Sequence, residues 1–415
     1  MVMPTITVDH TDLDPCQVGV PVSIVHGRSD VSSQPDAPTL DFTWLGPIPP
    51  GEVGDRVDVW LPPPVEPLGP GTWGDTRITW GDRFWTWNGD RTSVWRFSGE
   101  ITGLLAHEEL GLVVDWHVTA TGWQARLGRR TLTYTAAANS TDTDRAHGIF
   151  NSFRVGDLNP YRHPVEVRGA PGVTVLPHDY TPDQVDPLSV LQELATQSAG
   201  LLWQQRDGTV TYGSMYHRDV DPVAVVDCTL LADGVQWDQQ VENIVNRVTV
   251  EYGPDASRAT VVVDDTASLT KYNVMAVQVS TELVDDTNAS TMGAVIIARR
   301  KDPYWMSAGV TIALKDVEDP QARDILDLDV GDGLYMPIPV TPGPTPSVIN
   351  SWTVEGWQEV WDEFGVHDLM LAVVDRQRWG TSGVTSWQSV RDAGTWGDWQ
   401  ATTWLDMLTD VGGPT

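Results

Sequence analysis

Carboxylates beside tryptophans are the residues of this sequence whose types suggest chemistry. The chain has 57 Asp and Glu residues, only 26 Lys and Arg residues, and 20 Trp. Enzymes that hydrolyse glycosidic bonds use a pair of carboxyl groups, one as acid and one as nucleophile or base. Nothing in the sequence indicates that two of these carboxylates face each other. Glu100 and Glu355 fall near matching positions of a segment that occurs twice in the chain, as described below, and a catalytic pair is not usually duplicated in this way. We therefore expect that the protein is not a hydrolase. The candidate carboxylates are Glu100, Glu108, Asp115, Glu355 and Asp362.

Metal-binding patterns are weak. The run from His107 to Glu109 lacks a second His at helical spacing, so we expect a solvated loop there. Residues 327–333 (DLDVGDG) look like a calcium loop, but Leu and Val alternate with the acids and the closing Glu is missing. That alternation predicts a strand entering a turn. Cys16 and Cys228 could pair in principle, although two reduced thiols made in a cytoplasm are the simpler expectation. We therefore predict no metal site and no cofactor.

Signatures of nucleophilic and phosphate chemistry are missing from the sequence. It contains neither a Gly-x-Ser-x-Gly elbow nor a Walker loop. Its Gly-rich stretches, such as residues 331–333, precede expected strands, so they cannot form the helix N-terminus that binds phosphate. We expect a protein that is not an enzyme.

The net charge of −31 argues against nucleic-acid binding, which needs Lys and Arg to neutralise phosphates. The acids are spread along the chain, as on a solvated surface whose charges repel one another. No apolar run approaches the roughly 18 residues that a membrane span needs. The first ten residues have neither the basic region nor the apolar core of a secretory signal.

A motif that occurs twice organises the chain. Residues 52–61 (EVGDRVDVWL) and 329–338 (DVGDGLYMPI) each join a Gly-Asp turn to a short apolar strand. The flanking strand patterns also match in order, so we interpret the chain as two copies of one β module. The matched flanks are 21–27 with 246–253, 39–44 with 259–263, 94–101 with 349–357, and 113–123 with 366–375.

Four parts follow from this duplication. Residues 1–130 are predicted to be the first β module, with a Trp-rich insertion at 62–92, and residues 131–242 a small α+β domain. Residues 243–375 are predicted to be the second β module, and residues 376–415 a Trp-rich C-terminal extension. The fold class is therefore mainly β, with two similar modules flanking a smaller α+β domain.

Helix signals are clearest in the predicted α+β domain. Asp186 is a candidate N-cap, Pro187 suits the first helical position, and Gly200 ends the pattern, which predicts a helix and then a hairpin over residues 201–212. Apolar residues at helical spacing predict a second helix over residues 143–153. A third is expected from about residue 288 to Arg300, within the second β module.

Tryptophans of the insertion and the extension are the candidate interface residues. Both segments contain Thr-Trp-Gly-Asp, at 72–75 and 395–398. These tryptophans either anchor neighbouring chains or other proteins, or pin each loop to its own domain, and sugar binding is a third possibility. The candidates are Trp73, Trp80, Trp87, Trp387, Trp396, Trp399 and Trp404.

This order of features resembles the tail hub proteins of tailed bacteriophages, also called baseplate hub or minor tail proteins. The resemblance lies in the helix and hairpin of residues 188–212, the strand of 243–252, the two Val-Gly-Asp turns and the Thr-Trp-Gly-Asp repeat. It covers about residues 18–375, while the insertion and the extension depart from the family pattern.

The resemblance implies β-barrel-like tube modules and a trimer, in which three chains present six similar domains to a sixfold tail tube. It implies a homotrimer at the virion tail tip, assembled in the host cytoplasm. Implied partners are the distal tail protein or tail tube, the tape measure protein and other tail-tip proteins. Genomic DNA would pass through the channel without specific binding, and an acidic lumen would repel it. The alternatives are a carbohydrate-binding or carbohydrate-active protein, and a secretion-system spike hub of the same fold.

Overall fold

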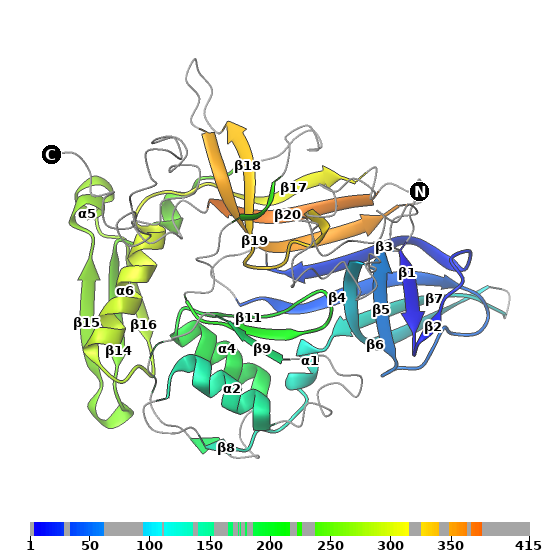
Figure 1. Ribbon diagram of the computed structural model, residues 1–415, viewed down its shortest axis with the longest axis horizontal. Coiled ribbons are helices and arrows are strands. Elements are labelled where there is room, and N and C mark those ends of the chain that lie inside the picture. The colour runs from blue at the N-terminus through cyan, green and yellow to red at the C-terminus, as the bar shows by residue number, and fades with distance from the viewer. Residues whose placement is uncertain are drawn as a thin grey trace, which may run out of the picture.

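The structure is a computed structural model and describes residues 4–28, 34–61, 94–109, 112–135, 140–152, 165–168, 173, 175, 179–180, 186–215, 222–225, 237–314, 325–339, 348–362 and 367–375. A sheet of 12 strands dominates it, and two smaller units, each with helices and a three-stranded sheet, lie beside this sheet (Figure 1). None of the described helices is long and apolar enough to cross a membrane.

The first half of the large sheet is an antiparallel array in the order β3-β4-β7-β6-β5-β1-β2. Its strands alternate between buried apolar and exposed polar residues, as in β4, where Leu40 and Phe42 are buried. These strands are β1 (Thr5–Val8), β2 (Thr11–Asp12), β3 (Val18–Gly27), β4 (Asp36–Leu45), β5 (Arg56–Leu61), β6 (Val94–Glu109) and β7 (Leu112–Gly122).

The second half of the sheet repeats the pairing order of the first. The order β17-β20-β19-β18 reproduces β4-β7-β6-β5, and both runs are antiparallel. This confirms the mainly β fold with two similar modules. In the described residues, the sheet stays open between β13 and β2 and no pairing closes it into a barrel. The strands are β13 (Pro222–Val225), β17 (Met306–Ala313), β18 (Gly333–Pro339), β19 (Val348–Trp361) and β20 (His367–Asp375).

The predicted match of residues 246–253 and 259–263 with strands of the first module is wrong. These residues form β14 (Arg247–Tyr252) and β15 (Ala259–Asp264), which pair with β16 (Ala276–Ser280) in a separate three-stranded sheet. An alternating pattern shows that one face is buried but does not identify the sheet to which a strand belongs. The place of β3 is instead taken by Asp238, which forms an antiparallel bridge with Met306 at the start of β17.

The helices lie mostly where the sequence predicts them. The helix α4 (Pro187–Gln197) is capped by Asp186, whose carboxylate accepts a hydrogen bond of 2.8 Å from the Ser189 N–H. The helices α2 (Asp142–Ser152) and α6 (Asp286–Arg300) also confirm the prediction, whereas α1 (Gln124–Leu127) and α5 (Thr266–Tyr272) were not predicted. The two short 3-10 turns are Val241–Asn243 and Asp255–Ser257.

The predicted hairpin is formed by β11 (Leu201–Gln204) and β12 (Val210–Gly213), and β9 (Val165–Arg168) adds a parallel strand. The helices α2 and α4 lie together against this sheet (Figure 1). The remaining pair is β8 (Tyr134–Thr135) with β10 (Asp179–Tyr180).

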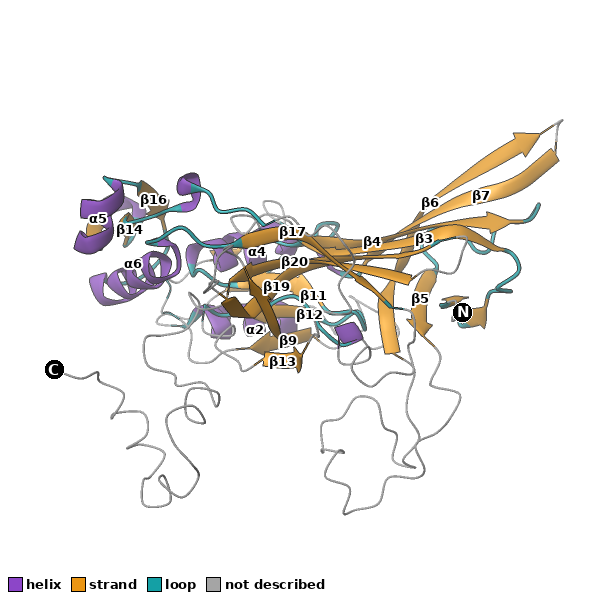
Figure 2. Ribbon diagram, turned by 90° about the horizontal axis from the view of Figure 1, so that it is seen from above, coloured by secondary structure: helices purple, strands orange, loops and turns teal. Residues whose placement is uncertain are grey.

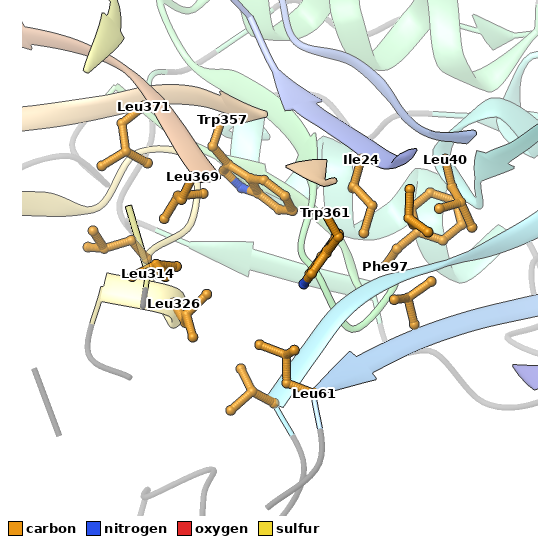
Figure 3. Close-up of a cluster of buried hydrophobic side chains, with 14 of the residues drawn as sticks. Ile24, Leu40, Leu61, Phe97, Leu314, Leu326, Trp357, Trp361, Leu369 and Leu371 are labelled. Carbon is orange, nitrogen blue, oxygen red and sulfur yellow. The ribbon is translucent and has the colours of Figure 1, made fainter. Parts of the chain in front are cut away.

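Two main hydrophobic cores hold these layers together. One joins both halves of the large sheet, and Figure 3 shows Ile24 and Phe97 of the first module in the same cluster as Trp357, Trp361 and Leu369 of the second. The other joins α2 and α4 to β14 and α6. Residues 243–300 therefore share a core with the α+β part, and the domain boundaries after residues 130, 242 and 375 stay predictions.

Candidate functional site

The junction between the two β modules is built on one long strand, β19. Its first half pairs with β18, where Thr353 lies opposite Gly333, and its second half pairs with β3, where Gly356 lies opposite Gly27. Both halves also pair with β20. Since β20 occupies one edge of β19, β18 and β3 must share the other edge, and β19 is the strand through which the modules become one sheet.

Two glycines allow β3 and β19 to come close at the junction. A Cβ atom on Gly27 would lie 2.6 Å from the carbonyl oxygen of Glu355, and one on Gly356 would lie 2.6 Å from the carbonyl oxygen of Arg28. Gly27 also has φ of +77°, a conformation that side chains with a Cβ rarely adopt. Glycine is therefore required on both strands.

Ion pairs cross the same junction. The Arg28 side chain binds the buried Glu355 carboxylate with Nη2 to Oε2 at 2.7 Å, and the Arg28 N–H donates to the Glu355 carbonyl at 3.0 Å. Arg96 of the first module is fully buried and donates from Nε to Glu359 of β19 at 2.7 Å. The Glu359 carboxylate also contacts His367 of β20.

The charge of Glu359 is held in place by its partners. Burial alone would raise the pKa of this carboxyl group, but the positive charge of Arg96 and the contact with His367 outweigh burial and lower the pKa to about 2. A buried ion pair costs much to desolvate and gives geometric definition when fully partnered. This pair fixes the orientation of β6 relative to β19.

The hairpin of the α+β part reaches the junction through Arg206. Its guanidinium lies 4.5 Å from the centre of the Trp357 ring, and the backbone N–H of Arg206 donates to the Asp329 carboxylate at 3.3 Å. His26 stacks on the same Trp357 ring, with centroids 4.4 Å apart. Burial, together with the charge of Arg96, lowers the pKa of Arg206 to about 9, and burial with Arg206 lowers the pKa of His26 well below its usual range.

The two Val-Gly-Asp turns have matching geometry. The Glu52 N–H donates to the Asp55 carboxylate at 2.7 Å, and the Asp329 N–H donates to the Asp332 carboxylate at 2.8 Å. Gly54 and Gly331 occupy the left-handed region in both copies, with φ of +101° and +91°. The motif that occurs twice in the sequence therefore forms the same turn in both modules.

The environments of the two turns differ. The second turn packs against Arg206 and Arg168, while Asp55 of the first is half-exposed. Burial, with the charge of Asp329 next, raises the pKa of Asp332 to about 6. The predicted strand at residues 327–330 is wrong, because Leu328 and Val330 are buried from an irregular turn and β18 begins only at Gly333.

The candidate carboxylates serve the fold or lie at the surface. Glu100 is bound by Arg126 at 2.6 Å and by Arg129 at 2.7 Å, much as Glu355 is bound by Arg28. Glu108 is exposed near the end of β6. Asp115 of β7 lies 3.0 Å from the His107 ring, so the run from His107 to Glu109 lies in strand β6 and the predicted loop is wrong. Asp362 lies just after β19, so these carboxylates are on separate parts of the fold.

The residues that form the junction were not identified from the sequence. Arg96 is the one that the sequence could have indicated, because it lies among apolar residues of a predicted strand, where a charged side chain needs a partner. The seven candidate interface tryptophans lie outside the described residues, as do the insertion and the C-terminal extension. Within the described part, no group of three or more His, Cys, Asp or Glu side chains is arranged to hold a metal ion.

Comparison with known proteins gives matches by structure alone. No protein-family model and no curated protein sequence matches the chain. The 43 kDa tail protein of prophage MuSo2 from Shewanella oneidensis is 12% identical with a TM-score of 0.57, covering 91% of this chain and 99% of that one. A tail protein from Neisseria meningitidis is 12% identical with a TM-score of 0.58, covering 91% and 97%.

A third solved structure is similar over almost its whole length. The prophage tail protein gp18 from Listeria monocytogenes is 8% identical with a TM-score of 0.52, covering 89% of this chain and 94% of that one. The chain therefore has the fold of phage tail proteins, which confirms the fold that the sequence resemblance implied.

Proposed function

We propose that this chain is a structural protein of a phage tail, and that three copies form a hub ring at the distal end of the tail. The observation that carries the proposal is the repeated pairing order of β4-β7-β6-β5 and β17-β20-β19-β18 within one chain. Three chains with two similar modules each give a ring of six similar modules. Such a ring can contact a sixfold tube on one side and a threefold tip on the other.

The fold supports this proposal. Three proteins named as tail proteins share the architecture over about nine-tenths of this chain. The rigid junction at β19 also fits a structural role, because the two modules must keep a fixed relative orientation to act as equivalent units of a ring.

The chemistry of the described residues supports a role without catalysis. The buried carboxylates Glu100, Glu355 and Glu359 are all bound by arginines. The tryptophans Trp123, Trp203, Trp352 and Trp361 are fully buried, so they offer no platform to a sugar ring. A carbohydrate-binding function would have to depend on partly exposed tryptophans such as Trp95, which is 36% exposed, or on tryptophans of the insertion or the extension.

The proposed partners are other copies of the chain, the tail tube or distal tail protein, the tape measure protein and further tip proteins. The proposed location is the virion tail tip, after assembly in the host cytoplasm. Genomic DNA would pass through the ring, and the net charge of −31 would keep the DNA from adhering to its wall.

Labelling of intact phage particles tests the location. Gold-conjugated antibodies against this chain, viewed by electron microscopy, should mark the end of the tail farthest from the capsid. Antibodies against the major capsid protein of the same particles serve as the control. Label along the whole tail, or on the capsid, would contradict the hub.

A further inference from the structure

The junction inside the chain offers a template for a contact between chains. The second half of β19 pairs antiparallel with β3, so that Gly356 lies opposite Gly27 and Gln358 lies opposite Val25. If the two modules are equivalent, the second half of β6 should have an edge that can pair with a further strand, as the second half of β19 pairs with β3. The partner of β6 should be the segment that occupies the position of β3 in the second module.

The registers of β6 and β19 can be aligned residue by residue. In the first module Ile101 pairs with Ala120 of β7, and an irregularity follows before Gly103 pairs with Thr119. In the second module Val354 pairs with Val373 of β20, and the same irregularity precedes the pairing of Gly356 with Ala372.

The turns fix the same alignment independently. The Gly54 N–H donates to the Ile101 carbonyl at 2.8 Å, and the Gly331 N–H donates to the Val354 carbonyl at 2.7 Å. Gly103 is therefore equivalent to Gly356, and Leu105 to Gln358.

The segment of the second module that occupies the position of β3 can be identified by comparing the strand pairings of the two modules. Val25 of β3 pairs with Thr39, which pairs with Thr121 of β7. In the second module Asp238 bridges Met306, which pairs with Val374 of β20. Since Thr121 and Val374 occupy equivalent positions, Asp238 is equivalent to Val25. Gln240 is then equivalent to Gly27 in position. It differs in conformation, because its backbone is extended, with φ of −112° and ψ of 138°, whereas Gly27 has φ of +77°.

Both edges are exposed in the single chain. Among the described strands β6 pairs beyond Gly103 only with β7, and Leu105 is 68% exposed. Residues 238–242 are exposed, including Val241 at 50%. The β6–β7 hairpin extends from one end of the molecule, whereas β17, whose Met306 bridges Asp238, lies well away from the tip of this hairpin (Figure 2). Two edges that lie apart on the molecule suit head-to-tail association.

We propose that residues 103–106 of β6 pair antiparallel with residues 237–240 of a second copy of the chain, with Leu105 opposite Asp238. Backbone hydrogen bonds would extend the sheet from the first module of one copy to the second module of the next. This contact would repeat between chains the junction that β19 and β3 make within one chain. The proposal rests on the trimeric hub and specifies how its ring closes.

Paired cysteines test the register. In the template, Arg28 and Glu355 form a hydrogen-bonded pair, so Val25 and Gln358 form a non-hydrogen-bonded pair, with Cα atoms about 4.5 Å apart, within disulfide reach. Leu105→Cys with Asp238→Cys should therefore link neighbouring chains under oxidation. The background carries Cys16→Ser and Cys228→Ser. Val25→Cys with Gln358→Cys is the matched control and should link within one chain, leaving its mass on a denaturing gel unchanged.

The outcomes separate this inference from the proposed function. Covalent dimers and a closed trimer for the double variant, with neither single variant linking, would support both. A native trimer without the link would overturn the pairing and leave the hub standing. A ladder that continues past three chains would support the pairing and contradict ring closure. A chain that stays monomeric and unlinked at its highest soluble concentration would contradict both.

A second variant avoids oxidation. A Cβ on Gly103 would meet only the Thr119 side chain, at 2.5 Å for Oγ1, whereas one on Gly356 would meet backbone atoms of β3. Gly103→Ala should leave the melting temperature of the monomer nearly unchanged and weaken association by about tenfold per contact. Gly356→Ala should lower the melting temperature itself. Unweakened association of Gly103→Ala would overturn the proposed close approach.

Discussion

Gly27 and Gly356 face each other across β3 and β19, where a Cβ atom on either residue would come within 2.6 Å of the opposite backbone. These two residues are 329 positions apart in sequence, yet they set the distance between the two halves of the large sheet. The close approach gives the two modules one fixed geometry, which is the property that a ring subunit needs.

Substitution of Gly27 should therefore be costly. Gly27→Ala adds a left-handed Cβ penalty of about 1 kcal/mol and an overlap penalty of about 1–3 kcal/mol, so the free energy of unfolding should fall by about 2–4 kcal/mol. Gly54→Ala is the matched control, because Gly54 also has positive φ but has nothing within 4 Å of its Cβ position. Equal losses for the two variants in urea denaturation would contradict the account of the junction.

Glu359→Gln should destabilise the fold strongly. The change leaves the buried Arg96 guanidinium without its counter-charge, and removal of one partner from a buried pair typically costs about 3–5 kcal/mol. Glu109→Gln, an exposed acid of β6, should change stability by less than about 0.5 kcal/mol. Urea denaturation at neutral pH measures both variants, and a near-neutral Glu359→Gln would show that the pair does not hold the modules.

The same pair predicts a loss of stability in acid. Folding lowers the pKa of Glu359 from 4.5 to about 2. The charged carboxylate therefore adds to the free energy of unfolding above about pH 4.5, and this stabilisation is lost as the pH falls toward 2. The difference in the free energy of unfolding between wild type and Glu359→Gln should shrink over this range. A difference that stays constant from pH 5 to 3 would contradict the assignment of charge to Glu359.

Asp332 should have the opposite pH dependence. Folding raises the pKa of Asp332 from 3.8 to about 6. The protonated carboxyl group therefore favours the folded state most below about pH 4, and this stabilisation is lost as the pH rises past 6. Asp332→Asn keeps an oxygen for the Asp329 N–H and should raise stability at pH 7 by about 1–2 kcal/mol. Asp55→Asn, in the half-exposed turn of the first module, should have little effect. An Asp332→Asn variant less stable than wild type at pH 7 would contradict this prediction.

Tryptophans of the C-terminal extension stay candidates for assembly. If Trp387, Trp396 and Trp404 anchor neighbouring proteins, their replacement by Ala should reduce incorporation of the chain into tails by about tenfold or more. Quantitative immunoblots of purified particles measure this, with circular dichroism to show that the variant is folded. Normal incorporation combined with lost retention on a glycan array would favour the carbohydrate-binding alternative.

Local signals predicted local structure well. Asp186 before Pro187 marks a capped helix, because both residues satisfy or avoid the unpaired N–H groups of a first turn. The Gly-Asp turns were found in both modules because their left-handed glycines and capping carboxylates are set by neighbours in sequence. The duplication could therefore be predicted from the two turns.

Contacts that are distant in sequence could not be predicted in this way. Residues 247–264 alternate like a strand pair of the large sheet but belong to another sheet, since alternation does not specify a partner. In the second module the position of β3 is occupied by the segment around Asp238, which bridges Met306. Residues 237–242 (WDQQVE) are mostly polar and do not show the alternation that predicts a strand. The partners of Arg96 and Arg206 depend on strands more than 100 residues away, so the junction became visible only in the folded chain.

The mass of the purified chain under native conditions tests whether three copies form a ring. Native mass spectrometry over a range of protein concentrations should reveal a species of three times the chain mass of 45.6 kDa, with no four- or five-chain species. Such a trimer would agree with a ring of six modules. A monomer at every concentration, or a stable dimer, would contradict the threefold hub.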